Sequence, residues 1–89
     1  MQVEYYAEDV PFIADVMSWA PLDHIIKKLE KGRISEECDE FMWCELSREE
    51  LDELTGWLCN EANHNKKKRI AERIGEIADS FLVQLQLYK

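Results

Sequence analysis

Four side chains that could bind zinc or act as nucleophiles are spread over the middle of this 89-residue sequence: Cys38, Cys44, Cys59 and His64. Structural zinc sites usually place paired cysteines about two to four residues apart, and no two cysteines here have that spacing. A cysteine nucleophile would need a nearby base, but neither His64 nor His24 stands in a recognisable catalytic context. We therefore expect thiols buried as small hydrophobic side chains, with no metal and no cofactor.

Carboxylates are abundant, and paired carboxylates can perform general acid and base catalysis. That chemistry needs one carboxyl group desolvated and another solvated across a cleft, and a chain this short has little room for such a cleft. The sequence also lacks the glycine-rich phosphate-binding motifs and the G-x-S-x-G motif of serine hydrolases. No enzyme activity is expected.

The carboxylates are concentrated in one segment, which carries nine acidic residues and a single base, Arg48. The nine are Glu36, Glu37, Asp39, Glu40, Glu45, Glu49, Glu50, Asp52 and Glu53. Repulsion among so many like charges costs stability, so a cationic partner that neutralises them would be stabilising. The alternative is a solvated face that only confers solubility.

Trp43 lies within this acidic segment, and the local conformation decides what its indole does. In a helix of about 100° per residue, Trp43 falls on the outward side among carboxylates. The buried arc of that helix would hold Ile34, Cys38, Phe41 and Met42. Trp43 would then be an apolar anchor in a binding surface, ringed by charges that steer a cationic partner. If the segment is bent or extended, Trp43 instead packs beneath a neighbouring helix as part of the core.

The charge balance excludes some partners. The chain has 11 basic and 19 acidic residues, a formal net charge of −8, which disfavours binding to a phosphate backbone or an anionic membrane. Residues 1–62 carry 16 acids and 5 bases, whereas residues 63–89 carry 3 acids and 6 bases. The basic cluster Lys66–Arg69 is most simply a partner for the acidic segment, in the same molecule or in a second copy. A solvated patch and a nucleic-acid contact are the alternatives.

The cysteine count and the first residues bear on localisation. Three cysteines are an odd number, and the start of the sequence has neither a basic nor an apolar leader region, which is typical of a cytoplasmic protein with reduced thiols. The apolar runs are only a few residues long, far short of the roughly 20 needed to span a bilayer.

The sequence predicts that the acidic residues, Trp43 and the cysteines are positioned by helices joined by tight turns. Asp9 and Pro11 suit the start of a first helix, and a second helix from about Pro21 should end before Gly32 as its C′ residue. Ser35 suits the N-cap of a third helix that contains the acidic residues. The alternation in residues 2–6 and 82–89 would also suit strands, so a minor terminal β pairing is an alternative for these ends.

Ser47 and Glu50 form a capping box, which predicts that a helix begins there. Its apolar stripe would hold Leu51, Leu54, Leu58 and Ala62, and a later stripe Ile70, Ile74, Ile77, Ala78, Phe81, Leu82 and Leu85. We expect a break between the two stripes near Asn63 to Asn65, followed by a long C-terminal helix. The predicted fold is all-α: a single domain, residues 1–89, of four or five helices packed antiparallel.

These observations favour a small acidic protein-binding module that inhibits or regulates a basic protein, most naturally a nucleic-acid enzyme or toxin whose cationic groove accepts carboxylates in place of phosphates. The predicted partner-binding residues are Glu36, Glu37, Asp39, Glu40, Trp43, Glu49, Glu50 and Glu53. In size, acidity and helical pattern the chain resembles nuclease-immunity proteins and phage-encoded inhibitors of host defence, a resemblance of class that no motif carries. The alternative function is a self-assembling helical protein whose apolar faces are completed by a second copy.

Overall fold

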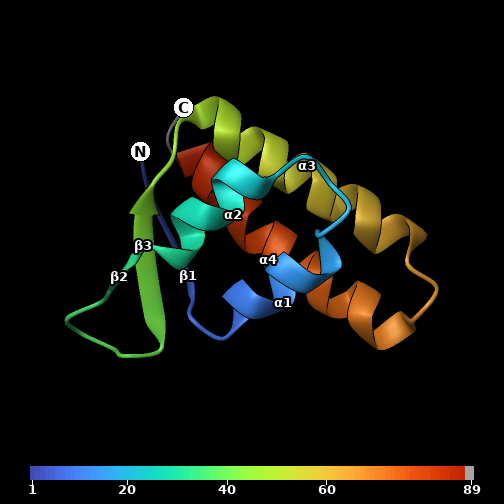
Figure 1. The fold of residues 1–89 in the computed structure, drawn as a ribbon, viewed down its shortest axis with the longest axis horizontal. Coiled ribbons are helices and arrows are strands. Elements are labelled where there is room, and N and C mark those ends of the chain that lie inside the picture. Colours follow the sequence, from blue (N-terminus) through green and yellow to red (C-terminus); the bar gives the residue numbers. More distant parts are fainter. Residues whose placement is uncertain (88–89) are drawn as a thin grey trace. The chain divides into compact units, whose positions relative to one another are not determined.

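The computed structural model describes residues 1–87 and contains both helices and a sheet (Figure 1). In chain order the elements are β1 (Gln2–Tyr6), α1 (Asp9–Val16), α2 (Asp23–Glu30), β2 (Arg33–Ile34), β3 (Phe41–Glu45), α3 (Arg48–His64) and α4 (Lys68–Leu87). The prediction of an all-α bundle is therefore wrong, because three antiparallel strands accompany the helices. The chain divides into two compact units, a first unit that ends at Ser47 and a second unit that begins at Arg48. That residues 1–89 form a single domain stays a prediction.

The sheet of the first unit has the strand order β1-β3-β2, so β3 pairs on both sides. Val3 lies opposite Cys44 in the pairing of β1 with β3, and Arg33 lies opposite Trp43 in the pairing of β2 with β3. The alternation in residues 2–6 correctly predicted a strand, but its partner is β3 rather than the C-terminal end of the chain.

One face of this sheet is turned to α1 and α2, as the contacts of α1 with β1 and of α2 with β3 indicate. The buried side chains of the two helices fall at helical spacing, with Val10 and Ile13 on α1 and Ile25, Ile26 and Leu29 on α2. The buried hydrophobic residues of the first unit are Val3, Tyr5, Val10, Ile13, Met17, Ala20, Leu22, Ile25, Ile26, Leu29, Cys44 and Leu46. Since strand side chains alternate, the opposite face of the sheet carries Gln2, Glu4, Tyr6, Arg33, Phe41, Trp43 and Glu45.

The helix expected after Ser35 is absent, and a loop followed by β3 takes its place. The Ser35 hydroxyl oxygen accepts a hydrogen bond from the Glu37 backbone N–H at 3.3 Å, so this serine supports a local turn rather than a helix N-cap. The residues that follow alternate in the sequence, with Cys44 and Leu46 buried and Glu45 exposed. This alternation is typical of a strand with one buried face, and the prediction of a helix overlooked it.

Gly32 follows α2, as expected, but its role is to leave space for the hydroxyl group of Tyr5. Among residues 1–87 no glycine has a positive φ. The Tyr5 hydroxyl donates a hydrogen bond of 2.6 Å to the Leu29 carbonyl oxygen, and a Cβ on Gly32 would collide with that hydroxyl and lie 2.8 Å from the Trp43 carbonyl oxygen. Burial raises the pKa of Tyr5 well above its usual value, with a further contribution from Cys44, so the phenol stays protonated as a donor.

The second unit consists of α3 and α4, which pack against each other. α3 begins directly after Ser47, where the capping box predicted a helix start. The predicted break near Asn63 to Asn65 is confirmed: the Asn65 side-chain oxygen accepts a hydrogen bond from the Lys67 backbone N–H at 2.9 Å, and α4 starts at Lys68. Buried residues of the two stripes are Leu51, Leu54, Leu58, Ile74, Ile77, Ala78, Phe81 and Leu85.

The strand-like alternation at the C-terminal end is misleading, because α4 continues as a helix to Leu87. The last two residues of that predicted strand lie outside the described residues. Neither α4 nor any other helix within residues 1–87 combines the length and apolarity needed to cross a membrane.

The space at Gly32 leads to a stability prediction. The substitution Gly32→Ala should lower the free energy of unfolding by about 1–3 kcal/mol, because the displaced Tyr5 hydroxyl would stay buried without its acceptor. Gly56→Ala is the matched control, since that helical glycine has no atom near its would-be Cβ and alanine should stabilise α3 by about 0.5–1 kcal/mol. Urea unfolding followed by circular dichroism measures both. Equal stability of the Gly32→Ala variant and the unmodified protein would contradict this account.

Candidate functional site

The sheet face that points away from α1 and α2 carries aromatic and charged side chains together. Tyr6 and Phe41 are register partners on β1 and β3, and their rings stack with centroids 4.4 Å apart. Two residues further along β3, Trp43 lies between Glu4 of β1 and Arg33 of β2. The Arg33 guanidinium carbon is 5.6 Å from the centroid of a Trp43 ring, within the range of a cation–π interaction.

A cavity of about 730 Å³, which we call the sheet hollow, is lined by residues of the three strands and of the loop that joins β2 to β3. Its wall combines apolar, acidic and basic side chains. The lining residues are Gln2, Glu4, Arg33, Ile34, Ser35, Glu36, Glu37, Cys38, Phe41, Met42 and Trp43. Aromatic rings from β3 and carboxylates from the neighbouring loop therefore meet at one concave surface, which suits a ligand that is both cationic and partly apolar.

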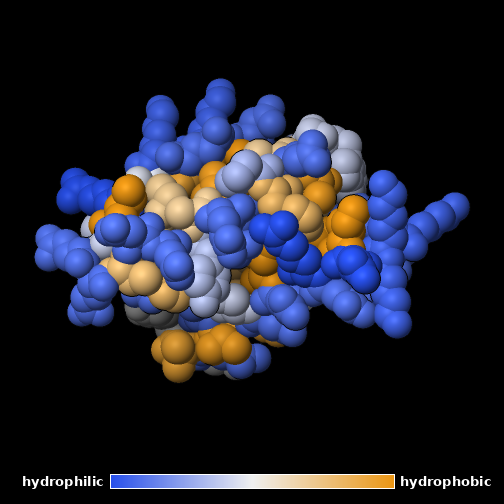
Figure 2. All heavy atoms as spheres, turned by 90° about the horizontal axis from the view of Figure 1, so that it is seen from below, coloured by the Kyte–Doolittle hydropathy of each residue, from blue (hydrophilic) through white to orange (hydrophobic). Residues whose placement is uncertain are grey.

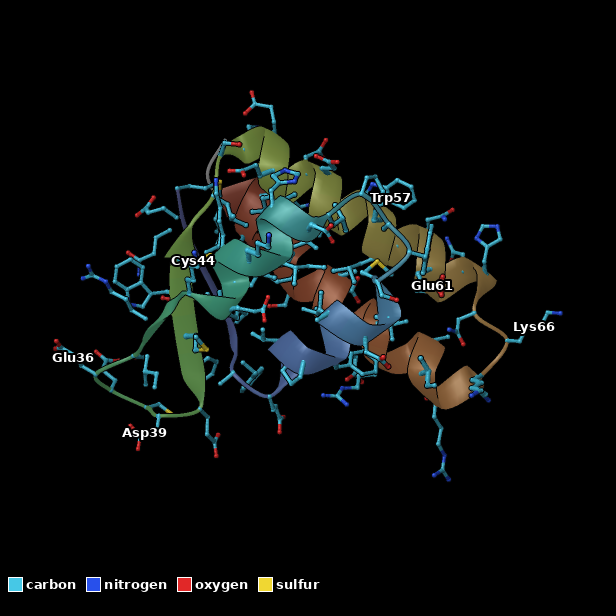
Figure 3. All side chains as sticks on the ribbon, viewed as in Figure 1. Glu36, Asp39, Cys44, Trp57, Glu61 and Lys66 are labelled. Carbon is cyan, nitrogen blue, oxygen red and sulfur yellow. The ribbon has the colours of Figure 1, made fainter. Side chains whose placement is uncertain are left out.

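The acidic part of the sheet hollow comes from the loop of residues 35–40, which we call the acidic loop. Its ends are held by backbone hydrogen bonds, from Ser35 N–H to the Phe41 carbonyl at 2.9 Å and from Phe41 N–H to the Cys38 carbonyl at 3.2 Å. Figure 3 shows Glu36 and Asp39 at the far end of this loop, directed away from the sheet. All four of its carboxylate residues are exposed, so they carry their charge in solvent.

The predicted partner-binding residues are divided between the two units. Glu36, Glu37 and Trp43 line the sheet hollow, whereas Asp39 and Glu40 belong to the same loop without lining it. The remaining three, Glu49, Glu50 and Glu53, lie on the first two turns of α3 in the second unit. Glu49 and Glu53 are exposed there, while Glu50 is half-buried and contacts other groups of the protein. Of the predicted residues, the structure thus brings Glu36 and Glu37 to the same hollow as Trp43.

Trp43 has the extended conformation of the second sequence interpretation, but it lies on the sheet face that points away from α1 and α2. Its side chain is half-buried, and in the sheet Trp43 is paired with Glu4 of β1 and Arg33 of β2. The helical reading had also put Phe41 on the buried arc, whereas Phe41 lines the sheet hollow. Alternation over β3 places Phe41 and Trp43 on one face and Met42 and Cys44 on the other.

Sequence reasoning missed Glu4, Arg33 and Phe41 as members of this site. The alternation in residues 2–6 would have put Glu4 and Tyr6 on one face of a strand. Nothing local indicated that this face continues onto Arg33, because that requires knowing that β2 pairs with β3.

A second, smaller hollow of about 430 Å³ lies on α3. Its lining residues are Asp52, Glu53, Gly56, Trp57 and Asn60. Trp57 is half-buried and Gly56 leaves an open notch beside it. The exposed acids of α3 therefore have an aromatic neighbour of their own, and Trp57 is labelled on that helix in Figure 3.

The basic cluster Lys66–Arg69 occupies the turn before α4 and the first residues of that helix. All four side chains are exposed, and Lys66 projects from the turn in Figure 3. Within the second unit, as far as it is described, these cations form no ion pair with the acids of α3. That the cluster neutralises the acidic segment stays a prediction.

The three cysteines lie in three different environments. Cys44 is buried on the helix-facing side of the sheet, Cys38 is half-buried in the acidic loop, and Cys59 is exposed on α3. The expectation that all three are buried is therefore wrong for Cys59, and also for Cys38, which is only half-buried. Among residues 1–87 no three His, Cys, Asp or Glu side chains are grouped closely enough to hold a metal ion.

Comparison with known proteins adds no relative, since no protein-family model, curated protein or solved structure matches the chain.

The orientation of β3 predicts the reactivity of the thiols. Because Cys44 is covered and the other two cysteines are accessible, a thiol reagent should modify Cys38 and Cys59 in the native protein and Cys44 only after denaturant is added. Absorbance with an aromatic disulfide reagent measures this, and a Cys59→Ser variant isolates the reaction of Cys38. Protection of Cys38 together with rapid modification of Cys44 would contradict the strand assignment.

Proposed function

We propose that this chain is a small acidic protein-binding module that inhibits or regulates a basic protein partner by presenting the sheet hollow and the acidic loop to it. The partner class that suits this surface is a nucleic-acid enzyme or toxin. Such proteins carry a cationic groove for phosphates, and the exposed carboxylates of the acidic loop would occupy that groove in their place.

The observation that carries the proposal is the meeting of aromatic rings and carboxylates at one concave surface. Trp43 and Phe41 supply apolar area, while Glu36 and Glu37 supply negative charge at the same hollow. Interfaces often combine an aromatic anchor with a charged surround. A surface that served only solubility would not need half-buried aromatic rings beside its carboxylates.

The placement of the charges also supports rapid association. The carboxylates of the acidic loop are exposed and make no ion pair within residues 1–87, so their field reaches into solvent. Repulsion among them is relieved when a cationic surface approaches, which contributes to binding. Charges of this kind mainly raise the association rate, and salt weakens their effect.

The proposal predicts a charge-dependent interaction with basic nucleases. The double substitution Glu36→Gln/Glu37→Gln should raise the dissociation constant for a bound nuclease about 2- to 30-fold, if each exposed ion pair contributes about 0.2–1 kcal/mol. Surface plasmon resonance against a panel of cationic nucleases at low and high salt measures this, and a nuclease assay reports inhibition.

The matched control is Glu8→Gln/Glu30→Gln, which removes two exposed carboxylates of the first unit that do not line the sheet hollow. This control should bind nearly as well as the unmodified protein. If no basic protein binds, or if affinity is unaffected by salt and by the Glu36 and Glu37 substitutions, the proposal is wrong.

A second candidate function is self-assembly, which exposed apolar residues on α4 favour. Val83 and Leu87 lie one turn apart and are 54% and 76% exposed, and Leu82 is 40% exposed. Figure 2 shows hydrophobic surface between the hydrophilic side chains on the face that it presents. A second copy that covered the three α4 side chains would remove apolar area from water.

Self-assembly predicts a dimer that depends on α4. Sedimentation velocity should then detect a dimer at micromolar concentration, and Val83→Gln/Leu87→Gln should shift it to monomer, because the apolar contact is lost. The matched control is Glu76→Gln/Asp79→Gln, exposed residues of the same helix, which should leave the dimer intact. A chain that stays monomeric at high concentration rules this function out.

A further inference from the structure

We propose that the sheet hollow binds an arginine side chain of the basic partner, and that Arg33 occupies the arginine position until the partner displaces it. This inference rests on the proposed function and names the chemical group that the same hollow would take. Arg33 thus competes with the partner's arginine for the ring of Trp43.

The aromatic ring of Trp43 is the feature that selects arginine. Arg33 is exposed, yet its guanidinium carbon lies 5.6 Å from the centroid of the Trp43 ring. The ring is thus accessible to a guanidinium from the solvent side. A guanidinium is planar and weakly hydrated, so it stacks on an aromatic face at less cost than a lysine ammonium, which is compact and strongly hydrated.

The carboxylates of the acidic loop would complete the arginine site. Glu36 and Glu37 line the same hollow as Trp43, and a carboxylate binds a guanidinium through two parallel hydrogen bonds. Within residues 1–87 Arg33 forms no ion pair, and Trp43 is its aromatic partner. A partner arginine that reaches the ring and one of these carboxylates would therefore make more contacts than Arg33 makes.

Arg33 can leave the ring at small cost. It lies on β2, a strand of two residues, and its long side chain can turn to solvent without disturbing the backbone pairing with β3. An exposed cation–π contact is weak. While Arg33 stays on the ring, however, it blocks the ring face and repels an incoming cation, so its removal should strengthen binding of arginine.

A pair of variants tests the competition. Hexa-arginine and hexa-lysine peptides are titrated into the protein and followed by isothermal calorimetry. The arginine peptide should bind more tightly than the lysine peptide, and Arg33→Gln should tighten arginine binding by about two- to fivefold, the equivalent of one exposed cation–π contact. Lys27→Gln removes a positive charge from α2 that does not line the hollow, and it should change the affinity little.

The inference would be overturned by equal affinity for the two peptides or by no gain from Arg33→Gln. An equal gain from Lys27→Gln would also overturn it, because only net charge would then matter. Failure of both peptides to bind would overturn it as well. The proposed function is decided separately, by the binding of folded basic proteins and by the Glu36 and Glu37 substitutions.

Displacement of Arg33 has a direct spectroscopic readout. In protein labelled with nitrogen-15, the Arg33 Nε–Hε resonance should be shifted by the ring current of Trp43, and Trp43→Leu gives its unstacked position. Saturation with unlabelled hexa-arginine should move the resonance to that position. If the peptide binds and the resonance does not move, Arg33 is not displaced and the inference fails even though the proposed function stands.

Discussion

The pairing of β3 with strands on both sides is the interaction on which the rest of the first unit depends. With Val3 opposite Cys44 and Arg33 opposite Trp43, the alternation of strand side chains turns Cys44 and Leu46 toward the helices and leaves Phe41 and Trp43 on the other face. A shift of one residue in this register would exchange the two faces. The hydrogen bond from Tyr5 to Leu29 ties β1 to the end of α2. It can form only because Gly32 has no side chain that would displace the Tyr5 hydroxyl.

The same pairing converts an acidic stretch of sequence into a shaped surface. The acidic loop connects β2 to β3, so two of its acidic residues, Glu36 and Glu37, line the same hollow as Phe41 and Trp43 instead of being spread around a helix. Because these side chains are exposed, the cost of their repulsion is moderated by water and salt. The aromatic rings beside them are only partly covered, and the two kinds of group together distinguish this surface from a solvated acidic face.

Much of the helical structure could be predicted because its determinants are local. The capping box at Ser47 located the start of α3, and the polar residues around Asn65 located its end. The candidate site was predicted only in part: Glu36, Glu37 and Trp43 line the sheet hollow, but Arg33 and Phe41 were not expected there. Over the short segment of β3 the consecutive apolar residues fit both a helical and an extended conformation, so periodicity does not distinguish the two.

The amino-acid sequence by itself determined the charge of the acidic segment, the apolar faces of α3 and α4, the start of α3 and the break between α3 and α4, because capping and helical periodicity act over a few neighbouring residues. Only the tertiary structure decided that residues 41–45 form a strand, which face Trp43 occupies, and which basic residue stacks on it. Those outcomes depend on contacts between residues as distant in sequence as Val3 and Cys44, and a strand acquires its conformation from the partners that complete its hydrogen bonds.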